Sequence, residues 1–157
     1  MKIDVTDLQD TLEIPPGAVR RLVRAALGDL PGCYSVVFVD DERMTDINRQ
    51  YLGREGTTDV IAFPFEDAPL TEDDCAGEII VSAERARAEA GVRGIDPHAE
   101  LALYVVHGAL HLAGCDDQTP DQAAEMHARE KEILAELGYD VQRLWKPING
   151  EKKTREP

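Results

Sequence analysis

Three features that would place the chain in a specialised class are absent or sparse in its sequence. No apolar run approaches the roughly 18 residues that a membrane-spanning helix needs. The first residues, Met1 to Val5, lack the basic start and apolar centre of a signal peptide. Cys33, Cys75 and Cys115 are an odd, scattered set without a Cys-x-x-Cys motif, which argues against a disulfide framework. We therefore expect a cytoplasmic protein with no membrane partner.

Basic residues are also in short supply. The chain has 17 lysine and arginine residues against 31 aspartate and glutamate residues, which gives a formal net charge of −14 at pH 7. Proteins whose main partner is nucleic acid usually present a net basic surface. If this chain binds nucleic acid, we expect it to use local basic patches and a bound metal ion rather than its overall charge.

What the chain does contain is typical of one globular domain. Its 157 residues are 43% hydrophobic and 31% charged, and a chain of this length can bury a substantial core. No internal repeat, linker or second domain is recognisable. We predict a single domain over residues 1–148, followed by a polar, disordered tail over residues 149–157.

Hydrophobic spacing and turn residues predict elements in the order strand, helix, strand, helix, two strands and three helices. The predicted strands cover residues 2–5, 34–40, 59–65 and 77–82, and the predicted helices cover 16–30, 42–51, 83–90, 97–113 and 120–137. The helix that begins at Pro97 is apolar nearly all round, which indicates a buried central element. The fold class is therefore α+β, with this helix packed across a small mixed β-sheet.

That central helix carries the most informative motif, because residues 105–117 read V-V-H-G-A-L-H-L-A-G-C-D-D. His107 and His111 are four residues apart, so a helix places both imidazoles on one face. Gly114 can end the helix and reverse the chain, and Asp116 and Asp117 follow. Two imidazoles and one carboxylate with an open fourth position are typical of a catalytic zinc site.

A zinc site of this kind favours hydrolysis, because zinc lowers the pKa of a bound water to about 7. The ligand spacing matches that of the metzincin proteases, which carry a glutamate base directly after the first histidine. In this chain that position is Gly108. A zinc-dependent peptide or amide hydrolase is therefore an alternative that lacks its usual base.

Five blocks of the sequence carry a known combination of motifs. They are His107-Gly108-x-Leu110-His111-Leu112-x-Gly114-x-Asp116, Ile47-Asn48-x-x-Tyr51, the segment from Thr58 to Phe65, Gly77-Glu78-Ile79, and a C-terminal set with Glu125-Met126, Glu130, Ile133-Leu134 and Leu137-Gly138-Tyr139. Together they resemble the YbeY family of metal-dependent single-strand endoribonucleases, which act in ribosomal RNA maturation. The resemblance implies an α+β fold related to the zincins, one bound zinc ion, and a cleft in which RNA meets the metal. It also implies the small ribosomal subunit and its assembly factors as partners, with no DNA substrate.

The metal-binding block departs from the family pattern at one position. The family has a histidine as third ligand where this chain has Asp117. Aspartate is an acceptable zinc ligand, although its charge makes the ion a weaker Lewis acid. On register we favour Asp117 over Asp116, with Cys115 as a third alternative. The predicted zinc ligands are therefore His107, His111 and Asp117.

A second departure concerns an arginine that the family is thought to use on its substrate. Its position is occupied here by Leu52, but Arg54 follows two residues later in the same loop. A guanidinium there can offset the charge that develops on a phosphate, although an ordinary surface arginine is the alternative interpretation. The residues that we predict to be catalytic are Arg54 and, as a metal ligand, His111.

Several other polar residues carry weaker predictions. Glu130 lies on an apolar helix face, so we expect it to accept hydrogen bonds from the metal loop or an arginine, or to extend out at the edge. His98 and His127 are expected at the surface. A groove for single-stranded RNA requires that six arginines line one face: Arg20, Arg21, Arg24, Arg54, Arg85 and Arg87. A non-catalytic ribosome assembly factor with a structural metal is a further alternative.

Overall fold

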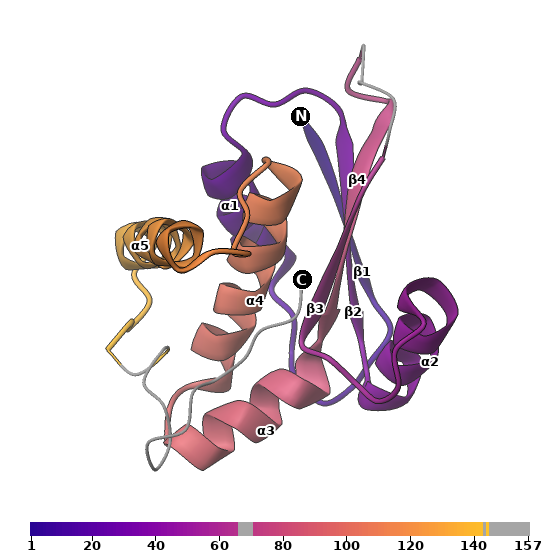
Figure 1. Cartoon of the computed structure of the whole chain (residues 1–157), viewed down its shortest axis with the longest axis vertical. Helices are drawn as coiled ribbons and strands as arrows, with labels where there is room; N and C mark the ends of the chain where they lie inside the picture. Colours follow the sequence, from indigo (N-terminus) through magenta and orange to yellow (C-terminus); the bar gives the residue numbers. More distant parts are fainter. Residues whose placement is uncertain (66–70, 143, 145–157) are drawn as a thin grey trace.

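The computed structural model of the chain describes residues 1–65, 71–142 and 144, and Figure 1 shows their arrangement. Within this part the elements are β1 Lys2–Asp7, α1 Pro16–Leu27, β2 Cys33–Val39, α2 Asp41–Leu52, β3 Val60–Pro64, β4 Cys75–Ser82, α3 Ala83–Arg93, α4 Pro97–Leu112 and α5 Pro120–Glu136. Their order is the one that the sequence predicts. The tail over residues 149–157, for which we predict disorder, lies outside the described residues.

The described strands form one mixed sheet in the order β1-β2-β4-β3. β1, β2 and β4 run parallel to one another, and β3 runs antiparallel to β4. β3 therefore lies at an edge, where Pro64 at the end of the strand is tolerated. The predicted α+β class and the small mixed sheet are both confirmed.

The helices divide between the two faces of the sheet, because alternate strand residues point to opposite sides. On one side Val60 and Ile79 belong to the main core, to which α1, α3, α4 and α5 also contribute. On the other side Ile61 and Ile80 pack with Met44 of α2. Figure 1 shows α2 across the sheet from α1, α4 and α5. α2 thus lies on the far side of the sheet from α4.

α4 is the central element of the main core. Every residue from Ala99 to Leu110 is buried, and the helix contacts β3 and β4 as well as α1, α3 and α5. The side chain of Asp96 caps its first turn by accepting a hydrogen bond from the His98 N–H at 2.9 Å. The predicted buried central helix is confirmed. No helix among the described residues has the length and apolar character to cross a membrane.

Gly108 sets the separation between α4 and the sheet. A Cβ atom at this position would lie 2.7 Å from Ile79 Cγ2 and 3.0 Å from Val60 Cγ2. These separations are shorter than van der Waals contact, so any larger residue must displace the sheet or the helix. Glycine is needed here for close approach.

We expect Gly108→Ala to destabilise the protein by about 1–3 kcal/mol, because an extra methyl group overpacks a filled core. The change in unfolding free energy can be measured by denaturant titration. Gly91→Ala is the matched control, since a Cβ at that helical position meets no atom within 4 Å, and alanine favours helix. A Gly108→Ala variant as stable as wild type would contradict the close packing.

α2 begins at Asp41, one residue before the predicted start at residue 42. Its cap is Asp40, whose side chain accepts a hydrogen bond from the Arg43 N–H at 2.8 Å. Asp41 instead accepts hydrogen bonds from the hydroxyls of Thr57 and Ser82, each at 3.1 Å. It therefore ties the loop before β3 to the end of β4.

Candidate metal centre

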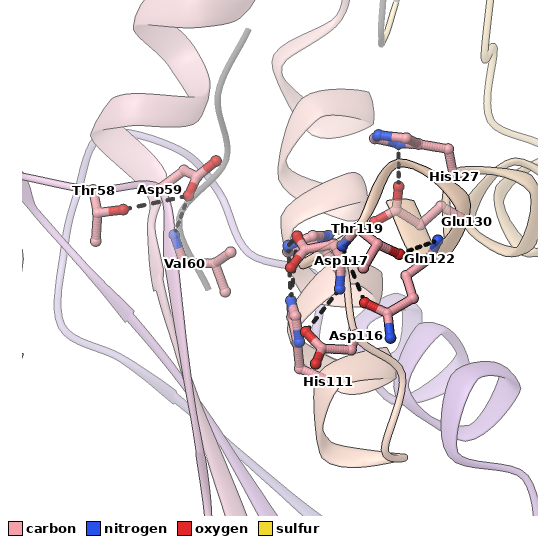
Figure 2. Close-up of polar contacts among 11 residues, drawn as sticks. Thr58, Asp59, Val60, His111, Asp116, Asp117, Thr119, Gln122, His127 and Glu130 are labelled. Atoms are coloured by element: carbon pink, nitrogen blue, oxygen red, sulfur yellow. Dashed lines mark hydrogen bonds and ion pairs between the residues drawn. The ribbon is translucent and has the colours of Figure 1, made fainter. Parts of the chain in front are cut away.

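Three side chains converge at the C-terminal end of α4. The Nε2 atoms of His107 and His111 lie 3.2 Å apart. Asp117 Oδ2 lies 3.7 Å from His107 Nε2 and 3.8 Å from His111 Nε2. Figure 2 shows Asp117 turned back from the loop after α4 towards His111. These three side chains form a group that can hold a metal ion.

The separations within this group suit a small ion. Three atoms bound tetrahedrally at about 2.0–2.1 Å lie roughly 3.3–3.4 Å from one another, close to the observed 3.2, 3.7 and 3.8 Å. His107 is 2% exposed, whereas His111 is 12% and Asp117 is 19% exposed. One side of the group is therefore buried and the other is open to solvent, where a fourth ligand can enter.

The loop between α4 and α5 returns the chain to the two histidines. Gly114 adopts a φ of 97°, which suits glycine, and the Cys115 N–H donates back to the last turn of α4. Thr119 and Gln122 form a capping box that begins α5. The short segment that carries Asp117 is thus fixed at both ends.

The neighbours of Asp117 do not join the group. Asp116 is exposed, and its Oδ1 accepts a hydrogen bond from the Asp117 N–H at 2.8 Å. Cys115 is also exposed. Of the three alternatives that the sequence leaves open, Asp117 is the one that the described residues group with the histidines.

A buried carboxylate orients the ring of His107. Glu130, on α5, is fully buried, and its Oε2 lies 2.6 Å from His107 Nδ1. Its Oε1 lies 3.1 Å from Nδ1 of His127, and Figure 2 draws this contact as a dashed line. When His107 donates its Nδ1 proton to Glu130, the lone pair on Nε2 is left for a metal ion.

From the sequence we predict that Glu130 contacts the metal loop or an arginine, or extends out at the edge. Glu130 is fully buried, so it does not extend out, and two of its contacts are with histidines. His127 lies near the surface as expected, with 47% of its side chain exposed, but it also contacts the buried carboxylate. The three-residue spacing of His127 and Glu130 on one helix face is the sequence signal that indicates this second contact.

The environment of His111 favours the neutral imidazole. Burial lowers the pKa of His111 below its usual value of 6.5, and neighbouring His107 lowers it further, whereas Asp117 raises it. The net effect is a lowered pKa. Because a metal binds the neutral ring, this shift lets the ligand remain available at lower pH.

The position after His107 has no room for a protease base. A side chain at Gly108 would run into Ile79 and Val60 of the sheet. Peptide hydrolysis by the metzincin route needs a glutamate at this position. The sequence lacks this glutamate, and the structure leaves no space for its side chain.

The six arginines come from three segments, and a common face for them stays a prediction. α1 and α2 lie on opposite sides of the sheet, as the two clusters of buried residues show. Arg20 donates from Nε to the Ile3 carbonyl at 3.2 Å. The arginines divide between α1, the loop after α2, and α3: Arg20, Arg21 and Arg24; Arg54; Arg85 and Arg87.

Arg54 lies in an exposed part of the loop between α2 and β3. Gly53 ends α2 in the left-handed conformation, with a φ of 64°, and the Arg54 backbone N–H donates to the Asn48 carbonyl at 3.3 Å. α2, which precedes this loop, packs on the face of the sheet opposite to α4.

Comparisons with known proteins point to one family. A family model described as Endoribonuclease YbeY matches residues 5–138. A protein named Endoribonuclease YbeY from Symbiobacterium thermophilum is 39% identical over 133 residues, covering 76% of this chain and 85% of its own length. The protein of that name from Azorhizobium caulinodans is 37% identical over 151 residues, covering 89% and 94%. The solution structure of TM1509 from Thermotoga maritima has the same fold, with a TM-score of 0.63 at 24% identity over 86% of this chain and 88% of that one.

Proposed function

This chain belongs to the YbeY family of endoribonucleases, and we propose that it cleaves single-stranded RNA with one zinc ion held by His107, His111 and Asp117. The observation that carries the proposal is the convergence of two imidazoles and a carboxylate, none more than 3.8 Å from the next, at a point open to solvent. Three protein ligands leave a fourth position for water or substrate, as a catalytic zinc site requires.

Side chains around the three ligands favour metal binding at this site, and the bound metal would serve phosphodiester cleavage. Glu130 holds the Nδ1 proton of His107, which directs the other ring nitrogen to the ligand position. Burial favours the neutral form of His111. When bound, zinc supplies Lewis acidity and lowers the pKa of water to about 7. Asp117 contributes one negative charge, so we propose a weaker Lewis acid and an altered metal preference compared with a site of three histidines.

We expect Asp117→Ala to lower zinc affinity by about 100-fold, because one of three ligands is lost and outer partners alone contribute about 10- to 100-fold. Isothermal titration of the metal-free protein with zinc measures this change. Asp117→His should retain binding, since imidazole is also a zinc ligand. Asp116→Ala is the matched control, because its carboxylate contacts a backbone N–H. Loss of zinc in Asp116→Ala but not in Asp117→Ala would reverse the assignment.

We propose Arg54 as the residue that offsets charge on the phosphate, in place of the family arginine lost at Leu52. Arg54 is exposed, in the loop that joins α2 to β3. We propose that one part of the RNA lies at the metal and a neighbouring part at this loop.

We expect Arg54→Ala to lower kcat for RNA cleavage by about 100-fold, because a positioned cation stabilises charge that develops in the transition state. Zinc content should stay at the wild-type level. Arg49→Ala is the control, since Arg49 is exposed and lies within 3.7 Å of both Asp46 and Glu55. Unchanged cleavage by Arg54→Ala would remove this residue from the mechanism.

We further propose ribosomal RNA as the substrate in the cell, the small ribosomal subunit and its assembly factors as partners, and the cytoplasm as the location. The family resemblance supports these assignments. The net charge of −14 argues against long-range attraction of RNA. Contacts at the metal and at single arginines must then supply the affinity.

The substrate class can be tested with the zinc-loaded protein on single-stranded RNA and on a casein-like protein. The proposal predicts cleavage of RNA and none of protein. Proteolysis would favour the peptide hydrolase, against which Gly108 counts. A zinc-loaded protein that cleaves neither substrate would favour an assembly factor with a structural metal.

A further inference from the structure

Cys33 and Cys75 lie opposite each other where β2 and β4 begin. The Cys33 N–H donates to the Asp74 carbonyl at 2.8 Å, which holds the two strands together at this end. Neighbouring strands lie about 4.7–4.9 Å apart. A disulfide typically spans roughly 4.4–6.8 Å between Cα atoms, so residues paired in this way are within its reach.

This cysteine pair projects from the face of the sheet away from α4. Tyr34 and Val36 belong to the main core, so the alternation of side chains along β2 places Cys33 on the other face. The register shifts just after the pair, because Tyr34 pairs with Gly77 and leaves Ala76 as an extra residue on β4. A bulge bends its strand locally, which eases small adjustments between the two thiols.

The two thiols have unequal surroundings. Cys75 is exposed, whereas Cys33 is half-buried and its thiol donates to Asp4 Oδ2 at 3.4 Å. Burial raises the pKa of Cys33, and the hydrogen bond to Asp4 raises it further. Because the thiolate is the reactive form, Cys75 should react first with an external reagent and Cys33 should react second.

We propose that Cys33 and Cys75 form a redox-active dithiol, which a small-molecule disulfide oxidises to an intramolecular disulfide. The Cys75 thiolate attacks one sulfur of the reagent, forms a mixed disulfide and releases one small thiolate. The Cys33 thiolate then attacks the Cys75 sulfur, forms the internal bond and releases the second small thiolate. The chain gives up two protons and two electrons, and the reagent is reduced to two thiols.

Carboxylates near the pair determine which reagent suits it. Asp4 contacts Cys33, and Asp73 and Asp74 directly precede Cys75; the nearby cation Lys2 is paired with Asp73 at 3.5 Å, so the local balance stays negative. These negative charges favour a cationic disulfide over an anionic one. Cystamine, a disulfide with two ammonium groups, is therefore the chosen probe.

The crosslink would enclose residues 34–74, a segment that contains α2 and β3. His107, His111 and Asp117 lie outside that segment. The proposal does not depend on RNA cleavage, and its test does not measure activity.

The test is to treat the folded full-length protein with excess cystamine and to analyse its intact mass and non-reduced peptides. Cys115→Ser should lose two hydrogen atoms and give a peptide pair linked through Cys33 and Cys75. Wild type should give the same linked pair together with a separate cystamine-derived adduct on the exposed Cys115. Cys33→Ser should stop at a stable adduct on Cys75, because the second thiol is missing.

Two results would overturn the proposal. One is folded wild-type protein that accumulates a cystamine-derived adduct on Cys75 without forming the internal bond. The other is an internal bond that includes Cys115. Protein oxidised in denaturant provides the reference, since unfolding removes the strand pairing and should yield mixed cysteine pairings.

Discussion

His111→Ala is expected to weaken metal binding and RNA cleavage together while leaving the protein folded. The imidazole is one of three converging ligands, with its Nε2 3.2 Å from that of His107. Two remaining ligands hold zinc weakly, and the Lewis acidity of a bound ion accounts for several kcal/mol of transition-state stabilisation. We therefore expect cleavage of single-stranded RNA to fall by about 1000-fold.

The fold should survive this change, because His111 lies in the last turn of α4 and faces solvent in part. Alanine is also the best helix former. His98→Ala is the matched control, since it removes the same side chain from the first turn of the same helix. This control should retain zinc and activity. Full-strength RNA cleavage by folded His111→Ala protein would remove the metal centre from the mechanism.

Glu130→Ala should weaken the metal centre without removing a ligand. Glu130 is fully buried, and its carboxylate lies 2.6 Å from Nδ1 of His107, which is 2% exposed. Alanine leaves that buried group without this partner, at a cost of about 1–3 kcal/mol in unfolding free energy. The freed ring is less well oriented, so zinc affinity should fall by about 10- to 100-fold.

Glu130→Gln separates the two contributions of this carboxylate. Glutamine keeps an oxygen that can accept the His107 proton but lacks the charge, so we expect a smaller loss of zinc affinity than for alanine. Glu132→Gln is the control on the same helix, because Glu132 is 59% exposed and pairs with Arg129. Zinc titration measures the zinc affinity of each variant, and denaturant unfolding measures its free energy of unfolding. Wild-type zinc affinity in Glu130→Ala would show that His107 needs no carboxylate partner.

The metal helix could be predicted from sequence because its signals are local. Asp96 and Pro97 mark its start, and helical periodicity alone places His107 and His111 on one face. The choice of Asp117 over Asp116 is harder to predict, since two consecutive carboxylates point in different directions. In the structure Asp117 groups with the histidines, whereas Asp116 is exposed.

Contacts between distant segments could not be predicted in the same way. The hydrogen bond between Glu130 and His107 depends on how α5 packs on α4. Spacing along the sequence cannot predict such a contact between residues on two different helices. The arginines show the same difficulty. Whether the arginines of α1 and Arg54 share a face depends on how the helices and the loop after α2 pack on the sheet, where α1 and α2 lie on opposite sides.

The most direct test of metal-dependent RNA cleavage is to remove and restore zinc in the wild-type protein. Zinc is stripped with a chelator and returned in steps, and bound zinc and cleavage of single-stranded RNA are measured in the same samples. We predict that activity disappears with the metal and returns in proportion to zinc bound, reaching its maximum at one ion per chain. Full RNA cleavage by zinc-free protein would contradict the proposed mechanism.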